Sequence, residues 1–101
     1  MTLTVTSRGD VPIRLTDERW AHIVEEHAEL AGMREGVMRA VLEAECVLAG
    51  GAGELIGVLT LEAGRALVVV YREVSPDDGF ILTAFLSSQL AKLYRRRQLW
   101  P

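Results

Sequence analysis

Both histidines of this chain, His22 and His27, lie in one early segment. The imidazole is the side chain that most readily exchanges a proton near neutral pH, so the pair could serve as general acid and general base. Residues 16–31 around them predict an amphipathic helix with Thr16 as its N-cap. On that helix His27 lies in the apolar stripe, and His22 lies about 140° away, near the polar side. The two imidazoles are therefore not expected to meet at one substrate atom.

Each histidine also has a purely structural interpretation. His27 could be a core histidine satisfied by one hydrogen bond, and His22 could be a solvated residue that pairs with Glu26 on the helix surface. A metal site is not expected, because the spacing of the two histidines is poor for chelation from one helix. The single cysteine, Cys46, is expected to be a small buried hydrophobe. The glycines near residue 50 match no phosphate-binding fingerprint, and we predict no cofactor.

Arg72 and Thr83 are two further candidates for a catalytic site. Thr83 interrupts the apolar run 80–86, where a hydroxyl either reflects strand propensity or faces a cleft that binds phosphate or a base edge. Arg72 follows the most apolar strand. Simple hairpin counting places Thr83 opposite Tyr71 and leaves Arg72 on the other face of the sheet. A one-residue bulge would reverse that arrangement.

The charge of the chain is unevenly distributed. The formal net charge is −3, so the field of the whole protein does not favour polyanions. Eleven of the 14 acidic residues precede residue 63, whereas the end of the chain mixes cations with aromatic side chains. Such a mixture either holds phosphates and stacks bases or forms a solvated charged tail. The cations concerned are Lys92, Arg95, Arg96 and Arg97.

The length and composition predict one globular domain. The chain has 101 residues, of which half are hydrophobic and a quarter are charged. The first residues do not resemble a signal peptide, and no apolar stretch reaches the ~20 residues of a membrane span. We therefore expect a cytoplasmic protein without membrane contact.

The pattern of residues predicts an α+β fold, with two N-terminal helices packed on a roughly four-stranded antiparallel sheet. Apolar strand-like runs between residues 46 and 87 are separated by turn residues, and Val68–Val70 is expected in the central strand. One face of the sheet packs on the helices. The other needs cover from the N-terminal arm, the C-terminal tail or a second copy of the chain. The expected segments are an arm at 1–15, helices at about 16–31 and 34–44, strands within about 46–87 and a basic tail at 90–101.

Three stretches in this order resemble a known nuclease family. They are Leu-Thr-x-x-x-Trp-x-His-Ile-x-x-x-His at residues 15–27, Phe-Ile-Leu-Thr-Ala-Phe at residues 80–85 and the terminal Leu-Trp. With the second helix and the antiparallel strands, they are similar to the phage-type branch of the barnase, EndoU, colicin-nuclease and RelE-like superfamily (the BECR fold). The resemblance covers roughly residues 12–100.

The resemblance implies a metal-independent endoribonuclease, toxin-like or phage-related, that cleaves RNA by attack of the 2′-hydroxyl on the adjacent phosphate. It implies that His22 and His27 are the two helix histidines of the motif and that Thr83 is the strand hydroxyl. Arg72 is our candidate for the cation that stabilises the phosphorane. The implied partners are RNA, through the cations of the tail, and an antitoxin or immunity-type protein.

A second hypothesis is a non-catalytic module on the same fold that binds RNA or protein or forms a homodimer. The acidic net charge favours it. So does Phe85, because the family commonly has a tyrosine there and phenylalanine lacks the hydroxyl. Ala28, where the family commonly has proline, is a further departure from the pattern.

Overall fold

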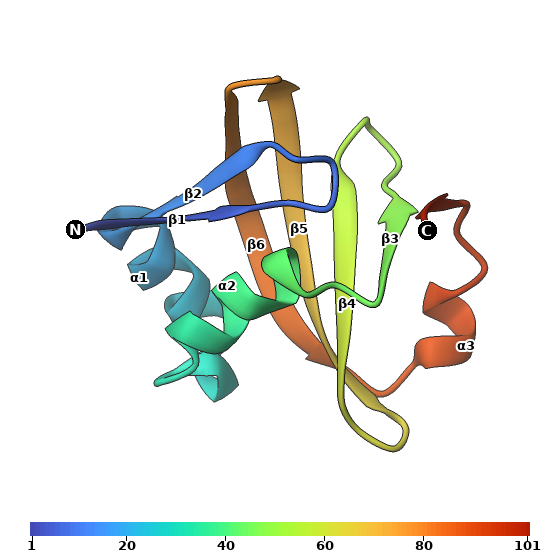
Figure 1. Cartoon of the computed structure of the whole chain (residues 1–101). Helices are drawn as coiled ribbons and strands as arrows, with labels where there is room; N and C mark the ends of the chain where they lie inside the picture. The colour runs from blue at the N-terminus through green and yellow to red at the C-terminus, as the bar shows by residue number, and fades with distance from the viewer.

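A computed structural model describes all residues of the chain, Met1–Pro101 (Figure 1). The chain forms seven strands, three α-helices and one 3₁₀ turn. The strands are β1 (Thr2–Thr6), β2 (Pro12–Thr16), β3 (Cys46–Ala49), β4 (Leu55–Glu62), β5 (Arg65–Ser75), β6 (Asp78–Ser87) and β7 (Gln98–Trp100). The helices are α1 (Asp17–Glu26), η1 (Ala28–Leu30), α2 (Arg34–Leu42) and α3 (Leu90–Leu93). None of the helices has the length and apolar character needed to cross a membrane.

The predicted fold class, two N-terminal helices on a roughly four-stranded antiparallel sheet, is wrong. The sheet is mixed and has seven strands in the order β1-β2-β6-β5-β4-β3-β7. The expected antiparallel strands β3 to β6 are present, with β5 at the centre, but the N-terminal arm adds β1 and β2 and the tail adds β7. The arm joins through a short parallel pairing of β2 with β6. These short segments carry weak strand patterns, and Pro12 is tolerated because it is the first residue of its strand.

The first helix is shorter than the sequence predicts. It begins as expected, with the Thr16 hydroxyl accepting a hydrogen bond from the Arg19 amide at 3.1 Å, but it ends at Glu26 rather than near residue 31. His27 has non-helical backbone angles, φ −132° and ψ 71°, and the 3₁₀ turn η1 follows it. This turn places Leu30 in the core without any exposed surface. A helical projection therefore does not apply to His27.

The helices α1 and α2 cover one face of the sheet, which we call the helix face (Figure 1). Gly57 of β4 lets α2 approach, because a Cβ atom there would lie 3.0 Å from the Ala40 carbonyl oxygen. A cluster of 14 buried residues fills the space between the two layers. It comprises Val11, Ile13, Leu15, Ile23, Leu30, Val37, Met38, Ala40, Val41, Leu67, Val69, Tyr71, Ile81 and Ala84.

The opposite face of the sheet, which we call the groove face, holds a smaller cluster of six buried residues. These are Cys46, Leu48, Ile56, Val58, Ala66 and Val68. Of the three covers considered from the sequence, the C-terminal tail provides one here, through Leu90 and Leu93 of α3. Cys46 is buried here as predicted, and its burial raises the pKa of the thiol.

The sheet curls until its two ends approach each other. Figure 1 shows the hairpin β1–β2 crossing the sheet, with its turn directed toward β3 and β4. Arg8 in that turn places its guanidinium carbon 4.4 Å from the centre of the Trp100 ring in β7. Its Nε also donates a hydrogen bond to the Ala44 carbonyl oxygen at 3.0 Å. The arm is therefore fastened to the last strand as well as to β6.

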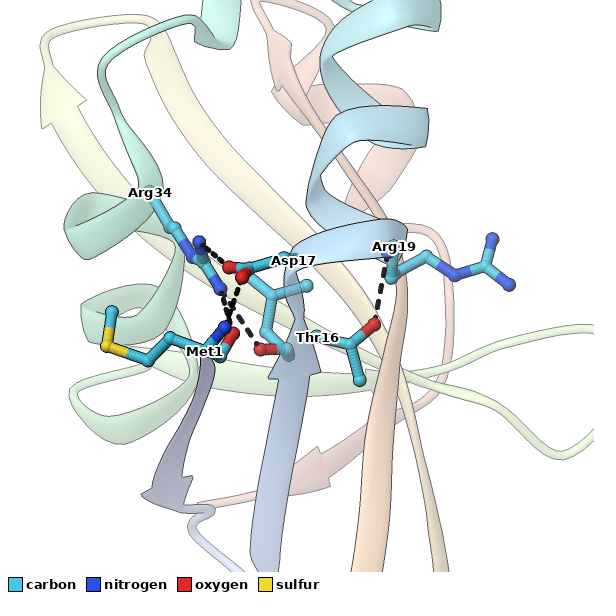
Figure 2. A network of polar contacts seen from close by, with 6 residues as sticks. Met1, Thr16, Asp17, Arg19 and Arg34 are labelled. Carbon is cyan, nitrogen blue, oxygen red and sulfur yellow. Dashed lines mark hydrogen bonds and ion pairs between the residues drawn. The ribbon is translucent and has the colours of Figure 1, made fainter.

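The start of the chain is held by a polar cluster around Asp17 (Figure 2). The amino group of Met1 and the guanidinium of Arg34 both donate to the Asp17 carboxylate, the latter at 2.6 Å. Arg34 also donates to the carbonyl oxygens of Met1 at 3.2 Å and Leu15 at 3.3 Å. The hydrogen bond from Met1 is the largest cause of a lowered pKa of the Asp17 carboxyl, followed by that from Arg34. We call this cluster the Asp17 clasp, because it joins β1, α1 and α2.

Candidate functional site

A β-bulge brings Arg72 and Thr83 to the same face of the sheet. Along the hairpin β5–β6, Val70 pairs with Thr83, but Arg72 pairs with Phe80, because the register shifts at Leu82. Side chains alternate along β5, so Arg72 lies on the same face as Val70. Thr83 lies on that face too, because it pairs directly with Val70. This is the groove face, opposite the helices. The simple register predicted from the sequence is wrong, and its one-residue alternative is correct.

The Thr83 hydroxyl is buried and has no hydrogen-bond partner in the protein. Almost all buried polar groups in proteins are hydrogen-bonded, and leaving one unpaired costs about 1–3 kcal/mol. Because the oxygen has almost no solvent-exposed surface, a ligand would reach it only after neighbouring side chains move. The Tyr71 hydroxyl in the core of the helix face is also buried and unpaired, so the unpaired oxygen does not decide between the two interpretations of Thr83.

Arg72 is held from one side by the loop between β3 and β4. One guanidinium nitrogen, Nη1, donates to the Ala52 carbonyl oxygen at 3.1 Å. The other, Nη2, lies 3.9 Å from a carboxylate oxygen of Glu54. The Arg72 side chain is 38% exposed and the Glu54 side chain only 18%. The carboxylate of Glu54 is itself fixed, because Oε1 accepts a hydrogen bond from the Ala52 amide at 2.9 Å.

A groove of about 730 Å³ lies on this face, between the sheet and the C-terminal tail. Its apolar lining, which we call the floor, consists of Ile56, Val70 and Phe85 of the sheet and Leu93 of α3. Three cations of the tail and one carboxylate, together with small and polar residues, complete the lining. These residues are Gly50, Gly51, Glu54, Ser87, Gln89, Lys92, Arg95 and Arg96. The local charge is thus positive, although the net charge of the chain is −3.

His27 lies beside the groove and is not a core histidine. Its ring centroid is 6.1 Å from that of Phe85, with the two planes inclined by 36°. The His27 side chain is 31% exposed, and its Nδ1 lies 3.8 Å from a carboxylate oxygen of Glu29. The early end of α1 explains this position, because His27 follows the last helical residue instead of belonging to the buried stripe.

His22 lies apart from the groove. Its Nε2 is 3.3 Å from a carboxylate oxygen of Glu26, and the His22 side chain is 57% exposed. The hollow that it lines belongs to the outer side of α1 and shares no lining residue with the groove. The surface-pair interpretation of His22 and Glu26 is confirmed, and the structure does not bring the two histidines to one point.

Of the predicted site residues, the groove lining includes only cations of the tail, and Arg72, Thr83 and His27 lie outside it. Lys92, Arg95 and Arg96 line the groove, whereas Arg97 does not, and its carbonyl oxygen instead accepts a hydrogen bond from the Ala49 amide at 2.8 Å. Sequence reasoning missed Glu54, the only carboxylate in the groove lining. Its one signal is its position at the end of a glycine-rich loop, directly before an apolar strand.

No protein-family model matches this chain, and no curated protein or solved structure is significantly similar to it. No group of three or more His, Cys, Asp or Glu side chains is positioned to hold a metal ion. Evidence for function consequently comes from the groove and its residues.

Proposed function

We propose that this domain binds RNA in the groove and cleaves it as an endoribonuclease that needs no metal. The observation that carries the proposal is the bulge at Leu82, which puts Arg72 and Thr83 on the face that also holds the cationic groove. A phosphate in the groove would meet the cations of the tail, and Arg72 and Thr83 lie on the same face just outside the groove lining, with the Thr83 oxygen covered by neighbouring atoms. Each of these groups favours a phosphate oxygen that carries negative charge.

The proposed reaction is an internal transfer of the phosphoryl group. The 2′-oxygen forms a bond to phosphorus while the bond from phosphorus to the 5′-oxygen breaks, leaving a 2′,3′-cyclic phosphate and a free 5′-hydroxyl. A base takes the 2′-hydroxyl proton, and an acid protonates the departing 5′-oxygen. Because His22 lies apart, we assign these two proton transfers to Glu54 and His27. Arg72 and Thr83 stabilise the charge on the pentacoordinate phosphorus.

The experiment is to incubate the purified protein with a structured RNA in the presence of EDTA and to analyse the new 3′ ends. We expect 2′,3′-cyclic phosphates. Replacing His27 by alanine should lower the cleavage rate by about 10²- to 10⁴-fold, the usual contribution of a general acid or base. The same replacement at His22 is the matched control and should leave the rate unchanged. Cleavage that stops in EDTA, or that survives His27→Ala, contradicts the proposal.

A second candidate function is RNA binding without cleavage. It is favoured by the engagement of Arg72, whose guanidinium already contacts the Ala52 carbonyl oxygen and faces Glu54. In that case the protein would retain a labelled RNA in a binding assay but would release no cyclic phosphate. The two functions share the groove and differ in whether Arg72 reaches the reacting phosphate.

A further inference from the structure

The groove combines an apolar floor with a cationic rim, and this combination indicates what form of RNA fits. Phe85 and Leu93 offer apolar surface at the floor, and Lys92, Arg95 and Arg96 stand around it. None of these three cations forms an ion pair within the protein. They are free to contact phosphates of a bound strand.

A paired duplex would leave most of this floor unused. In an RNA helix the bases are stacked and paired, so a protein meets mainly phosphates, 2′-hydroxyls and base edges. An unpaired base exposes its flat face, which gains from burial against aromatic and aliphatic side chains. An acidic protein segment would satisfy the cations, but it would fill the floor only where it also carried an aromatic side chain, whereas every nucleotide brings a flat base together with its phosphate.

We propose that the groove accommodates an unpaired nucleotide, with the base against Phe85 and the phosphates at Lys92, Arg95 and Arg96. This inference rests on the proposed binding of RNA and adds that the substrate is a single strand or loop. The groove volume, about 730 Å³, lies within the ~300–1,000 Å³ of typical ligand sites and is sufficient for a nucleotide. His27 supports Phe85 from the side, so that the two rings form one aromatic wall. Ser87 and Gln89 line the same groove and can form hydrogen bonds with the base edge.

The test uses RNA that cannot be cleaved, so that binding is measured apart from the reaction. The probe is a fluorescein-labelled 2′-O-methyl 12-mer without self-complementarity, alone or annealed to its 2′-O-methyl complement. We expect fluorescence anisotropy to show at least tenfold tighter binding of the single strand. Phe85→Leu should weaken single-strand binding by about fivefold to a hundredfold, because a stacked base contributes about 1–3 kcal/mol. Duplex binding should be unaffected by this substitution.

The matched control is Phe80→Leu, the same replacement on the same strand and face. Phe80 lies under the Arg14 guanidinium, 5.6 Å from it, and does not line the groove. This variant should bind like the wild type. If Phe85→Leu fails to fold, as judged by circular dichroism, Leu93→Asn tests the same floor from α3. Equal binding of duplex and single strand, or equal loss in the control, overturns the inference.

The same assays separate this inference from the proposed function. Selective single-strand binding without cleavage of unmodified RNA supports the inference and rejects the endoribonuclease. Cleavage accompanied by equal affinity for duplex and single strand rejects the inference and leaves the endoribonuclease standing. Displacement of the single strand by poly-glutamate of equal charge at equal concentration shows that the groove recognises charge alone, which also overturns the inference.

Discussion

The two faces of the sheet are closed in different ways. On the helix face, α1 and α2 cover 14 buried residues, whereas on the groove face six buried residues are covered mainly by α3, a helix of four residues. The larger cover excludes solvent from its whole cluster. The smaller cover leaves part of the sheet open as a groove. The helix face therefore supplies the larger part of the core, and the groove face keeps a surface that a ligand can reach.

Cations beside the two faces also differ in how many contacts their side chains make within the protein. Arg34, beside the helix face, donates to Asp17 and to two backbone carbonyl oxygens. The side chains of Lys92 and Arg95, beside the groove, donate no hydrogen bond to the protein, and the Arg96 guanidinium forms only a long one, 3.4 Å, to the Ala49 carbonyl oxygen. The Arg34 side chain is thus occupied in holding elements together, whereas those of Lys92 and Arg95 are available to a ligand. Arg72, also on the groove face, is engaged by the β3–β4 loop and is the exception.

The largest expected effect compares two adjacent valines of β5. Val69 faces the helices and Val68 faces the groove side, and neither has exposed surface. Val69→Ala should lower the free energy of unfolding by about 2–3 kcal/mol, because the cavity is enclosed by the sheet and two helices. Val68→Ala should cost about 1–2 kcal/mol, because the short α3 can settle into the space. Urea denaturation with unchanged m-values measures both losses. If Val68→Ala loses as much free energy of unfolding as Val69→Ala, or more, the two faces do not differ in how tightly they are covered.

The next effect concerns the cations of the tail. Replacing the three groove cations by glutamine should make binding of single-stranded RNA less sensitive to salt. In a plot of log K against log salt concentration, the slope should become shallower by about two units. Affinity at moderate salt should fall on the order of tenfold or more, because about three phosphate contacts are lost. The matched control removes three exposed arginines elsewhere and changes the net charge equally. The test variant is Lys92→Gln, Arg95→Gln, Arg96→Gln, and the control is Arg19→Gln, Arg39→Gln, Arg65→Gln. Equal losses in both would assign binding to overall charge rather than to the groove.

A smaller effect is expected at Glu54, the one carboxylate of the groove. Glu54→Gln removes the negative charge that faces Arg72 and repels phosphates, so the uncleavable single strand should bind a few-fold more tightly. If Glu54 is also the base, the cleavage rate should fall in the same variant. Glu62→Gln on the β4–β5 hairpin, which removes the partner of Arg65, is the control. Weaker binding in Glu54→Gln would show that Glu54 positions the loop instead.

The sequence predicted those parts of the fold that depend on local patterns. The strands between residues 46 and 87, the central place of Val68–Val70 and the N-cap Thr16 all follow from periodicity or capping chemistry. The arm was expected as two short extended pieces, the second an edge strand or a simple lead-in, and the tail was not expected in the sheet, because β7 has only three residues and shows no period. Their strands form only because an existing edge offers hydrogen-bonding groups to pair with.

The candidate site was harder to predict, because it depends on two irregularities. His27 leaves the helix where the chain turns to bury Leu30, and nothing in the local pattern marks that end. Arg72 and Thr83 share a face only through the bulge at Leu82, an ordinary apolar residue in an apolar strand. Both irregularities arise from long-range packing. The types of the candidate residues were therefore visible in the sequence, whereas their arrangement was not.

The smallest expected effect concerns the Asp17 clasp, where charge stabilises the helix side of the molecule. The pKa of the Asp17 carboxyl is lowered in the folded protein, first by Met1 and then by Arg34. Its contribution to stability is therefore fully present above the unfolded aspartate pKa of about 3.9 and is lost as the pH falls through the lowered folded value. Asp17→Asn should be less stable than the wild type near neutral pH, and the difference should shrink in strong acid. The clasp is exposed, so high salt should also reduce the difference.

Glu18→Gln is the control for the Asp17 prediction, because Glu18 is also in the first turn of α1 but forms no ion pair. Both substitutions remove a negative charge near the helix N-terminus, where it interacts favourably with the backbone amides. Only Asp17→Asn also removes the acceptor shared by Met1 and Arg34. Urea midpoints of the three proteins across acidic pH separate the two contributions. If Glu18→Gln loses as much stability as Asp17→Asn, the helix N-terminus accounts for the whole effect. The ion pairs of Asp17 with Met1 and Arg34 would then contribute nothing, and Arg34 would not differ from the groove cations in stabilising the fold.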